Sequence, residues 1–304
     1  MTYAIFFNPN AGDGEAEKTA QKLKAKLTDN GISAEFLTAP DEKQALEKIK
    51  KGIDQYDSLI AIGGDGTLNI AATAFVQKGK TIPFGVIPGG TVNNFAKRYQ
   101  IPQDEEEAMN VIIAGNTTKV GIGACKERSK AIVSSFAFGT FADISNEVRQ
   151  NEKQKFGRIV YVFKAIKQLG KNRSYKVHVK TEDFEETIKV WFALITTTKS
   201  IGGFNYAQSS PRAFHMSILH NIRLYKLFGL LYFVFTGKLR SSDSLTYLEP
   251  VHIQLEPRED AKVVVRIDGD KGPELPIDLE WLDDFIPLYV DEAKEKAARR
   301  EKNG

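Results

Sequence analysis

The sequence predicts an α/β plus all-β protein: an N-terminal doubly wound α/β domain followed by a C-terminal antiparallel β-sandwich domain. Up to about residue 120, short apolar runs alternate with amphipathic helical stretches, which is typical of a parallel sheet covered by helices. After Lys119 the chain carries β-rich runs instead, several of which alternate apolar and polar residues. The length of 304 residues allows two domains with separate cores.

Each strand expected in the first half is a short apolar run, and each expected helix carries apolar residues at helical spacing. The expected order is strand 3–7, helix 14–29, strand 33–37, helix 41–51, strand 58–62, helix 67–78, strand 84–87 and helix 104–115. The glycine pair at 89–90 leads into one more helical stretch, which ends near Lys97. Strands separated by helices are expected to pair in parallel.

The second half is expected to form antiparallel strands, because its β-rich runs alternate apolar and polar residues. The expected strands cover 132–138, 175–180, 187–197, 246–255 and 262–267, with the clearest alternation from Thr187 to Leu194. Helical insertions at about 156–169 and 220–236 interrupt them. The charged stretch from Asp291 to Gly304 is expected to be a solvated helix.

Composition and charge argue against several classes of protein. The formal net charge of +3 and the pI near 8.7 are too mild to favour a nucleic acid partner. The single Cys125 rules out an internal disulfide framework. The chain enters a strand at residue 3 without a basic and apolar leader, so we expect a cytoplasmic protein.

The most apolar segment, 227–235, is about half as long as a membrane-spanning helix. Its basic and tyrosine-containing flanks suit a helix on a membrane surface, but an apolar pattern on nearly all sides favours burial. Peripheral contact with the inner face of the membrane stays open as an alternative. The oligomeric state is open too, a homodimer being one option.

The most informative stretch is a glycine turn. The apolar run 59–62 passes through Gly63-Gly64-Asp65-Gly66 into the helix expected from Thr67. Glycines let backbone N–H groups approach an anion closely, and the positive end of a helix favours negative charge. A carboxylate beside a phosphate indicates a bridging cation, which Mg²⁺ bound by Asp65 and phosphate oxygens would supply. The alternative is that Asp65 only caps the helix.

Two further turns are of the same kind. The run Phe84–Pro88 leads through Gly89-Gly90-Thr91 into a helical stretch, and the run 3–7 ends in a loop that contains Asn8 and Gly12. In an open parallel sheet these loops would all lie at the carboxyl ends of strands, where ligands bind at the switch in strand order. Three such turns at one edge indicate a nucleotide.

Asp268 is the candidate catalytic residue. It follows the strand pattern 263–267 and precedes Gly269. In phosphoryl transfer one carboxylate typically takes the proton from the attacking hydroxyl. Aspartate and glycine at a strand end are also the commonest β-turn chemistry, and the local pattern taken alone favours that interpretation.

The turns belong to a longer series of motifs: Asn8-Pro9-Asn10-Ala11-Gly12, Gly63-Gly64-Asp65-Gly66-Thr67, Gly90-Thr91-Val92-Asn93-Asn94-Phe95-Ala96, the stretch from Gly202-Gly203-Phe204 to Ser210-Pro211-Arg212-Ala213, and Ile267-Asp268-Gly269-Asp270. In this order they resemble the soluble bacterial diacylglycerol kinase family, which is related to sphingosine and ceramide kinases. The turn at 63–67 is shared with NAD kinases and phosphofructokinases. Its combination with the turn at 90–96 and the late Asp-Gly is the specific feature.

This resemblance implies ATP-dependent phosphorylation of a hydroxyl of diacylglycerol or a related lipid, in a cleft between the two domains. It implies a nucleotide-binding domain of residues 1–121 with 287–304 and a lipid-substrate domain of residues 122–286. Asp65 would act through Mg²⁺, and Asp268 would be the general base. The candidate ATP-binding residues are Asn8, Gly12, Thr38, Gly63, Gly64, Asp65, Gly66, Thr67, Leu68, Asn69, Gly90, Thr91 and Asn93.

The chain departs from the family pattern by losing carboxylates. Ile70 stands where a glutamate is usual, Asn94 replaces an aspartate, and Gly121 falls where an aspartate often opens the sandwich. The Asp-Gly that normally follows the stretch ending at Ala213 is missing, so the resemblance does not predict the family's structural metal here. Asparagine keeps an acceptor but not a charge, which predicts weaker metal affinity or an altered substrate choice.

Two alternatives to a lipid kinase remain. A kinase of a soluble substrate such as NAD is disfavoured, because the second glycine turn resembles the lipid kinases. A catalytically weakened nucleotide-binding regulator is consistent with the missing carboxylates. Which lipid would be phosphorylated stays open.

Overall fold

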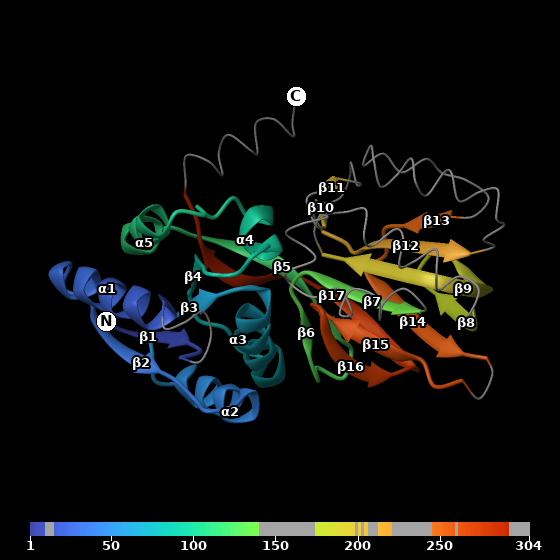
Figure 1. The fold of residues 1–304 in the computed structure, drawn as a ribbon, viewed down its shortest axis with the longest axis horizontal. Coiled ribbons are helices and arrows are strands. Elements are labelled where there is room, and N and C mark those ends of the chain that lie inside the picture. Colours follow the sequence, from blue (N-terminus) through green and yellow to red (C-terminus); the bar gives the residue numbers. More distant parts are fainter. Residues whose placement is uncertain are drawn as a thin grey trace. The chain divides into compact units, whose positions relative to one another are not determined.

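The structure is a computed structural model that describes residues 1–9, 15–139, 174–197, 200–201, 204–205, 212–220, 245–258 and 261–291. The chain forms two compact units (Figure 1). The first unit joins Met1–Val133 to Leu282–Gly304, and the second unit is Ser134–Trp281. The first unit is an α/β domain and the second is an antiparallel sheet domain, which confirms the predicted fold class.

The first unit is built on a parallel sheet. Its elements are β1 (Thr2–Phe7), α1 (Glu15–Asp29), β2 (Ser33–Leu37), α2 (Glu42–Gly52), β3 (Ser58–Gly63), α3 (Asp65–Lys78), β4 (Phe84–Pro88), α4 (Asn94–Arg98), α5 (Glu105–Ala114), β5 (Thr117–Cys125), β6 (Ala131–Ile132) and the end of β17 (Ile277–Tyr289). The strand order is β17-β4-β3-β1-β2, with parallel neighbours. The chain goes to opposite sides of β1 to form β2 and β3, so the order switches between β1 and β3.

Each face of this sheet has its own core, because successive residues of a strand point to opposite faces. Tyr3, Ile5 and Phe7 of β1 pack with residues of α1 and α5. Ala4 and Phe6 pack with residues of α2 and α3 on the other face. Figure 1 shows these two pairs of helices on opposite sides of the strands. The sheet is therefore doubly wound.

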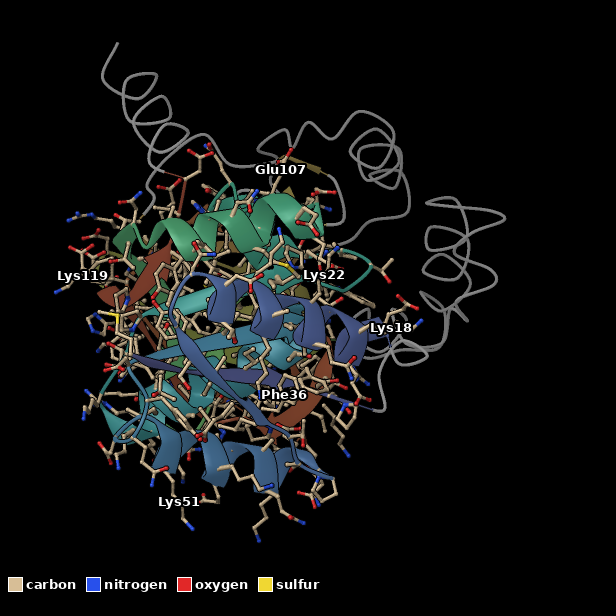
Figure 2. The ribbon with its side chains drawn as sticks, turned by 90° about the vertical axis from the view of Figure 1, so that its left-hand side faces the viewer. Lys18, Lys22, Phe36, Lys51, Glu107 and Lys119 are labelled. Carbon is tan, nitrogen blue, oxygen red and sulfur yellow. The ribbon has the colours of Figure 1, made fainter. Side chains whose placement is uncertain are left out.

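Helices α1 and α5 lie side by side on their face of the sheet (Figure 2). Lys22 of α1 forms ion pairs with Glu105 and Glu106 of α5, with N–O distances of 3.2 and 2.5 Å. The ammonium of Lys24 lies 4.9 Å from the centre of the Phe36 ring on the edge strand β2. This cation–π contact covers part of a ring that the edge strand leaves 41% exposed.

Capping residues explain why the predicted helix ends lie close to the observed ones. α2 and α5 begin after Asp41 and Asp104, and each carboxylate accepts a hydrogen bond from the backbone N–H three residues further on. α3 and α5 end at Gly79 and Gly115, which adopt the left-handed conformation that glycine allows. These are the signals from which helix ends are read in a sequence.

The second unit contains antiparallel strands. They are β7 (Ser135–Gly139), β8 (Tyr175–Lys180), β9 (Glu185–Thr196), β10 (Ser200–Ile201), β11 (Phe204–Asn205), β12 (His215–His220), β13 (Leu245–Leu248), β14 (His252–Pro257), β15 (Val264–Ile267), β16 (Asp270–Glu274) and the start of β17. β9 is central, since it pairs with β7, β8 and β12. β15 pairs with both β7 and β16, which brings the turn after Ile267 next to the start of β7.

A bulge interrupts the alternation predicted for β9. Ile188 and Val190 are buried, but the next buried residues are Ala193 and Ile195 rather than Phe192 and Leu194. The pairing of β9 with β12 shifts by one residue beside Trp191, because Leu219 and His220 face Phe192 and Val190. One extra residue in a strand moves all later side chains to the opposite face.

The division between the units differs from the predicted domain boundaries. The contacts place it after Val133 and before Leu282, whereas the sequence predicts boundaries after 121 and before 287. β5 and β6 belong to the first unit because their apolar side chains lie in its core. β17 was not predicted as a strand; it begins in the second unit and ends in the first.

Several sequence predictions fall outside the described residues. These are the helical insertions at 156–169 and at 220–236 apart from His220, the terminal helix 291–304 apart from Asp291, Gly12, and most of the stretch from 202 to 211. Among the residues that are described, no helix is long and apolar enough to cross a membrane.

Candidate active site

The predicted phosphate-binding loops follow β1, β3 and β4, at the carboxyl ends of three neighbouring parallel strands. β1 and β3 flank the switch in strand order, where doubly wound sheets bind ligands. Asn8 follows β1 directly and is exposed, and Thr38 follows β2 at the same edge of the sheet. The carbonyl of Thr38 accepts a hydrogen bond from Lys48 Nζ at 2.7 Å.

The turn after β3 requires glycine at its first position. Gly63 has a φ of +154°, and a Cβ placed on it would lie 2.4 Å from Thr67 Oγ1. Gly64 is the extended N-cap residue of α3, so the helix begins at Asp65. Gly66, in the first turn of α3, is exposed. The first turn of a helix presents unpaired N–H groups, so this loop retains the donors that an anion would need.

The second glycine turn packs on the first, backbone against backbone. The Gly89 N–H donates to the carbonyl of Gly63 at 2.9 Å. A Cβ on Gly90 would lie 2.6 Å from the Cα of Gly64, and a Cβ on Gly89 would lie 3.3 Å from the Cα of Gly63. Glycine in both turns therefore has a structural reason that is independent of any ligand: a side chain would separate them.

Asn93 holds the second turn closed. Its Oδ1 accepts a hydrogen bond from Gly90 N at 2.9 Å, and its Nδ2 donates to the Gly90 carbonyl at 2.9 Å. Its backbone is left-handed, with a φ of 53°, which asparagine tolerates better than most residues. The side-chain amide is thus paired with the backbone of its own loop. Thr91, between the two residues, is exposed and faces no such constraint.

Asp65 connects the two turns. Its Oδ2 accepts from Asn94 N at 3.0 Å and its Oδ1 accepts from Phe95 N at 3.1 Å. Both donors belong to the first turn of α4, and the N-cap residue Asn93 makes no side-chain capping bond to that helix. Asp65 therefore caps α4, although it is itself the first residue of α3. The sequence suggests that Asp65 could cap the helix that follows it, α3. In the structure it caps α4 instead.

Leu68 and Asn69 point into the core of the first unit. Leu68 is 1% exposed and lies in the cluster formed with α2 and α3. Asn69 is 3% exposed, and its Nδ2 donates to the carbonyl of Ala131 at 2.8 Å. The resemblance implies that both residues contact ATP. In the structure their side chains point into the core instead.

Asp268 occupies a tight turn and accepts two backbone hydrogen bonds. The two-residue loop Asp268-Gly269 joins β15 to β16, and both residues have positive φ, 53° and 94°, as a type I′ turn requires. Asp268 Oδ1 accepts from Ser134 N at 2.8 Å and from Ser135 N at 2.7 Å. Turn chemistry and a fixed carboxylate thus coexist at this residue.

The amides of Ser134 and Ser135 belong to the candidate site through their bonds to Asp268, and sequence reasoning missed them. No motif could have revealed them, because their contribution comes from backbone N–H groups that every residue except proline possesses. The Ser135 carbonyl also accepts from Asp268 N at 2.7 Å, so the turn is bound to this segment from both sides. A non-glycine residue at positive φ is strained, and such strain is concentrated at functional sites.

The positions that lack family carboxylates are integrated into the first unit. Ile70 is partly buried against its core. The Gly121 carbonyl accepts a hydrogen bond from Tyr99 Oη at 2.6 Å. Burial raises the pKa of Tyr99 and lowers that of the neighbouring Arg98, whose guanidinium lies 5.1 Å from the Tyr99 ring.

Comparison with known proteins finds similar sequences and similar folds. Residues 2–125 match the diacylglycerol kinase catalytic domain. Over nearly its whole length the chain is similar to curated bacterial diacylglycerol kinases. The diacylglycerol kinase of Staphylococcus saprophyticus is 26% identical over 291 residues, 94% of each chain, and that of Staphylococcus carnosus is 25% identical over 291 residues. The resemblance to diacylglycerol kinases predicted from the motifs is confirmed.

Solved structures share the fold. A structure from Bacillus anthracis has a TM-score of 0.77 at 18% sequence identity and covers 96% of this chain and 95% of that chain. A diacylglycerol kinase structure from the same organism has a TM-score of 0.71 at 14% identity. The domain match and the names of the staphylococcal relatives support a lipid kinase, that is, a phosphotransferase.

Proposed function

We propose that the chain is an ATP-dependent diacylglycerol kinase that transfers the γ-phosphoryl group to a hydroxyl of diacylglycerol or a related lipid. The observation that carries the proposal is the position of two glycine turns, Gly63–Gly66 and Gly89–Thr91. They lie at the carboxyl ends of β3 and β4, beside the switch in strand order, in the part of the chain that matches the diacylglycerol kinase catalytic domain.

The donor set of the two turns suits a polyphosphate. Gly66 and Thr91 are exposed, and α3 is long enough at 14 residues to favour an anion at its N-terminus. A side chain at Gly64 or Gly90 would push the two loops apart, so glycine at both positions keeps them together. Gly64, Gly66, Thr67 and Thr91 are the residues that we expect to hold ATP phosphates.

The carboxylate of Asp65 fits a magnesium ion as a single protein ligand. Each of its oxygens accepts one backbone hydrogen bond and retains a second acceptor position. Magnesium is commonly bound by one or two carboxylates together with substrate phosphates and water. When bound, the ion would neutralise charge on the phosphate oxygens.

Asp268 is the proposed general base. In the proposed reaction the lipid hydroxyl oxygen attacks the γ-phosphorus, the bond to the β-phosphate oxygen breaks, and the hydroxyl proton passes to the Asp268 carboxylate. Hydrogen bonds from Ser134 N and Ser135 N fix Oδ1 of this carboxylate, and we expect the carboxylate held in this way to accept the proton.

The test uses purified protein with labelled ATP, Mg²⁺ and mixed micelles of diacylglycerol. We expect lipid-dependent phosphate transfer, a loss of at least ~100-fold with Asp268→Asn, and little change with Asp270→Asn, an exposed aspartate of the same turn region. Full activity of Asp268→Asn would remove the proposed base. Phosphorylation of NAD in place of lipid would identify a kinase of a soluble substrate.

A nucleotide-binding regulator is the second candidate. The apolar Ile70 and the neutral Asn94 favour it, because each stands where the resemblance implies a carboxylate. ATP binding in calorimetry without transfer to any lipid in the panel would support this function instead.

A further inference from the structure

Helix α3 carries a polar stripe along one face of its apolar middle part. Asn69, Thr73 and Gln77 are spaced four residues apart and so share one helix face. Each of the three side chains bonds to the backbone of the segment 129–131, which leads into β6. The stripe therefore attaches α3, the helix that follows the first glycine turn, to the segment 129–131.

Asn69 and Thr73 together bind both polar groups of Ala131. The Asn69 Nδ2 donates to the Ala131 carbonyl at 2.8 Å, and the Ala131 N–H donates to Thr73 Oγ1 at 3.1 Å. Thr73 Oγ1 in turn donates to Asn69 Oδ1 at 3.2 Å. We call this arrangement the Ala131 clamp.

The Ala131 clamp is buried, which makes it rigid. Asn69, Thr73 and Ala131 are all 5% exposed or less, and water is therefore a poor substitute partner. Gln77, by contrast, is exposed and bonds the carbonyl of Ser129 at 2.8 Å. The two ends of the stripe thus differ in how strongly they hold the segment.

The segment held by the clamp leads directly to the amides that hold Asp268. Only Ile132, Val133 and Ser134 lie between Ala131 and Ser135. Val133 is buried in the core of the first unit, and Ser134 begins the second unit. Ser134 N and Ser135 N are the donors to Asp268 Oδ1.

We infer that Asn69 and Thr73 are positioning residues for Asp268, acting through the backbone from Ala131 to Ser135. The inference rests on the proposed function, in which Asp268 is the base. It assigns Asn69 a role in turnover and not in nucleotide contact. Loss of the clamp lets the Ser134 and Ser135 amides shift, and a small misplacement of a catalytic group lowers turnover by up to about 100-fold.

The experiment compares four variants of the full chain. Asn69→Ala and Thr73→Val remove the clamp, Thr73→Ser keeps its hydroxyl, and Gln77→Ala removes only the exposed end of the stripe. We expect kcat for diacylglycerol to fall about 10- to 100-fold in the first two variants, with Kd for ATP within about twofold of wild type. Thr73→Ser and Gln77→Ala should keep wild-type values.

Hydrogen–deuterium exchange tests the same inference without any substrate. The amides of Ser134 and Ser135 should exchange at least about tenfold faster in Thr73→Val than in Thr73→Ser, which remains informative if Asn69→Ala does not fold. Equal exchange in this pair, or equal losses of kcat and ATP affinity, would overturn the inference. A wild-type protein without phosphate transfer would overturn the proposed function, whereas the exchange result would still decide whether the clamp holds these amides.

Discussion

Gly90 lies so close to Gly64 that a Cβ on Gly90 would stand 2.6 Å from the Gly64 Cα. The same Cβ would lie 2.7 Å from Asn93 Oδ1, so it would meet both the neighbouring turn and the side chain that closes its own turn. Real side chains do not approach a backbone so closely. The two glycine turns consequently behave as one structural element, and a change in one must displace the other.

Gly90→Ala is expected to destabilise the first unit and to weaken ATP binding. Overpacking of this kind costs about 1–3 kcal/mol, and separation of the turns would lower ATP affinity at least ~10-fold. Thermal melting and titration calorimetry measure the two effects. Gly115→Ala is the matched control, since it introduces strain at a φ of +76° at the end of α5. It should lower the melting temperature and leave ATP affinity unchanged, and a parallel loss of affinity would contradict the prediction.

Asn93→Gly should destabilise the protein although glycine suits the left-handed backbone at this position. The variant leaves the Gly90 N–H and carbonyl without their side-chain partners, at an expected cost of about 1–3 kcal/mol in urea unfolding. Gln100→Gly provides the comparison, because Gln100 has nearly the same φ, 54°, at an exposed position. That variant should be neutral or stabilising. Equal effects of the two substitutions would mean that the hydrogen bonds between the Asn93 side chain and Gly90 contribute nothing to stability.

Asp65→Asn separates the capping role from the metal role. Loss of the charge should cost about 1 kcal/mol of stability, because α4 loses a charged acceptor for two N–H groups. It should also abolish the difference between ATP affinity measured with and without Mg²⁺. Asp104→Asn is the control, because it removes the charge at the start of α5 and keeps one acceptor for the Glu107 N–H. Its ATP affinity should keep its magnesium dependence. If the ATP affinity of Asp65→Asn also depends on Mg²⁺, Asp65 caps α4 and does not bind the metal.

Cys125 should be inert toward thiol reagents in the folded protein. It is 2% exposed, and burial raises the pKa of its thiol to about 11. Since the folded pKa lies above the unfolded value, this residue contributes stability below about pH 9 that is lost as the pH rises toward 11. Labelling with a disulfide reagent at pH 8 should be slow in buffer and fast in urea. Rapid labelling of the native protein would contradict the burial.

The α/β half could be predicted from sequence because its signals are local. Apolar runs of five or six residues, capping aspartates and terminal glycines mark each element independently of the rest of the chain. β5 and β17 were missed for equally local reasons. Gly121 and Gly123 weaken the strand signal of β5, while Asp283 and Asp284 interrupt the apolar pattern of β17 where it passes between the units.

The site could be predicted only in part, because a residue of a given type can either bind a ligand or stabilise the fold. The positions of the glycine turns at the strand ends follow from the pattern. The directions of the Asn69 and Asn93 side chains do not follow from the pattern. An asparagine that hydrogen-bonds to the backbone cannot be told in the sequence from one that binds a nucleotide. The spacing of Asn69, Thr73 and Gln77 was the available signal that one face of α3 holds a backbone segment.

The path of β17 determines when the first unit can complete its fold during synthesis. Leu288 of β17 pairs with Phe84 of β4, and β5 also depends on β17 for a partner. A nascent chain that has emerged only as far as Val133 therefore leaves β4 as an open edge, which is a site for mispairing. Although N-terminal domains usually fold first during synthesis, this one cannot close its sheet until the ribosome has translated past Leu288.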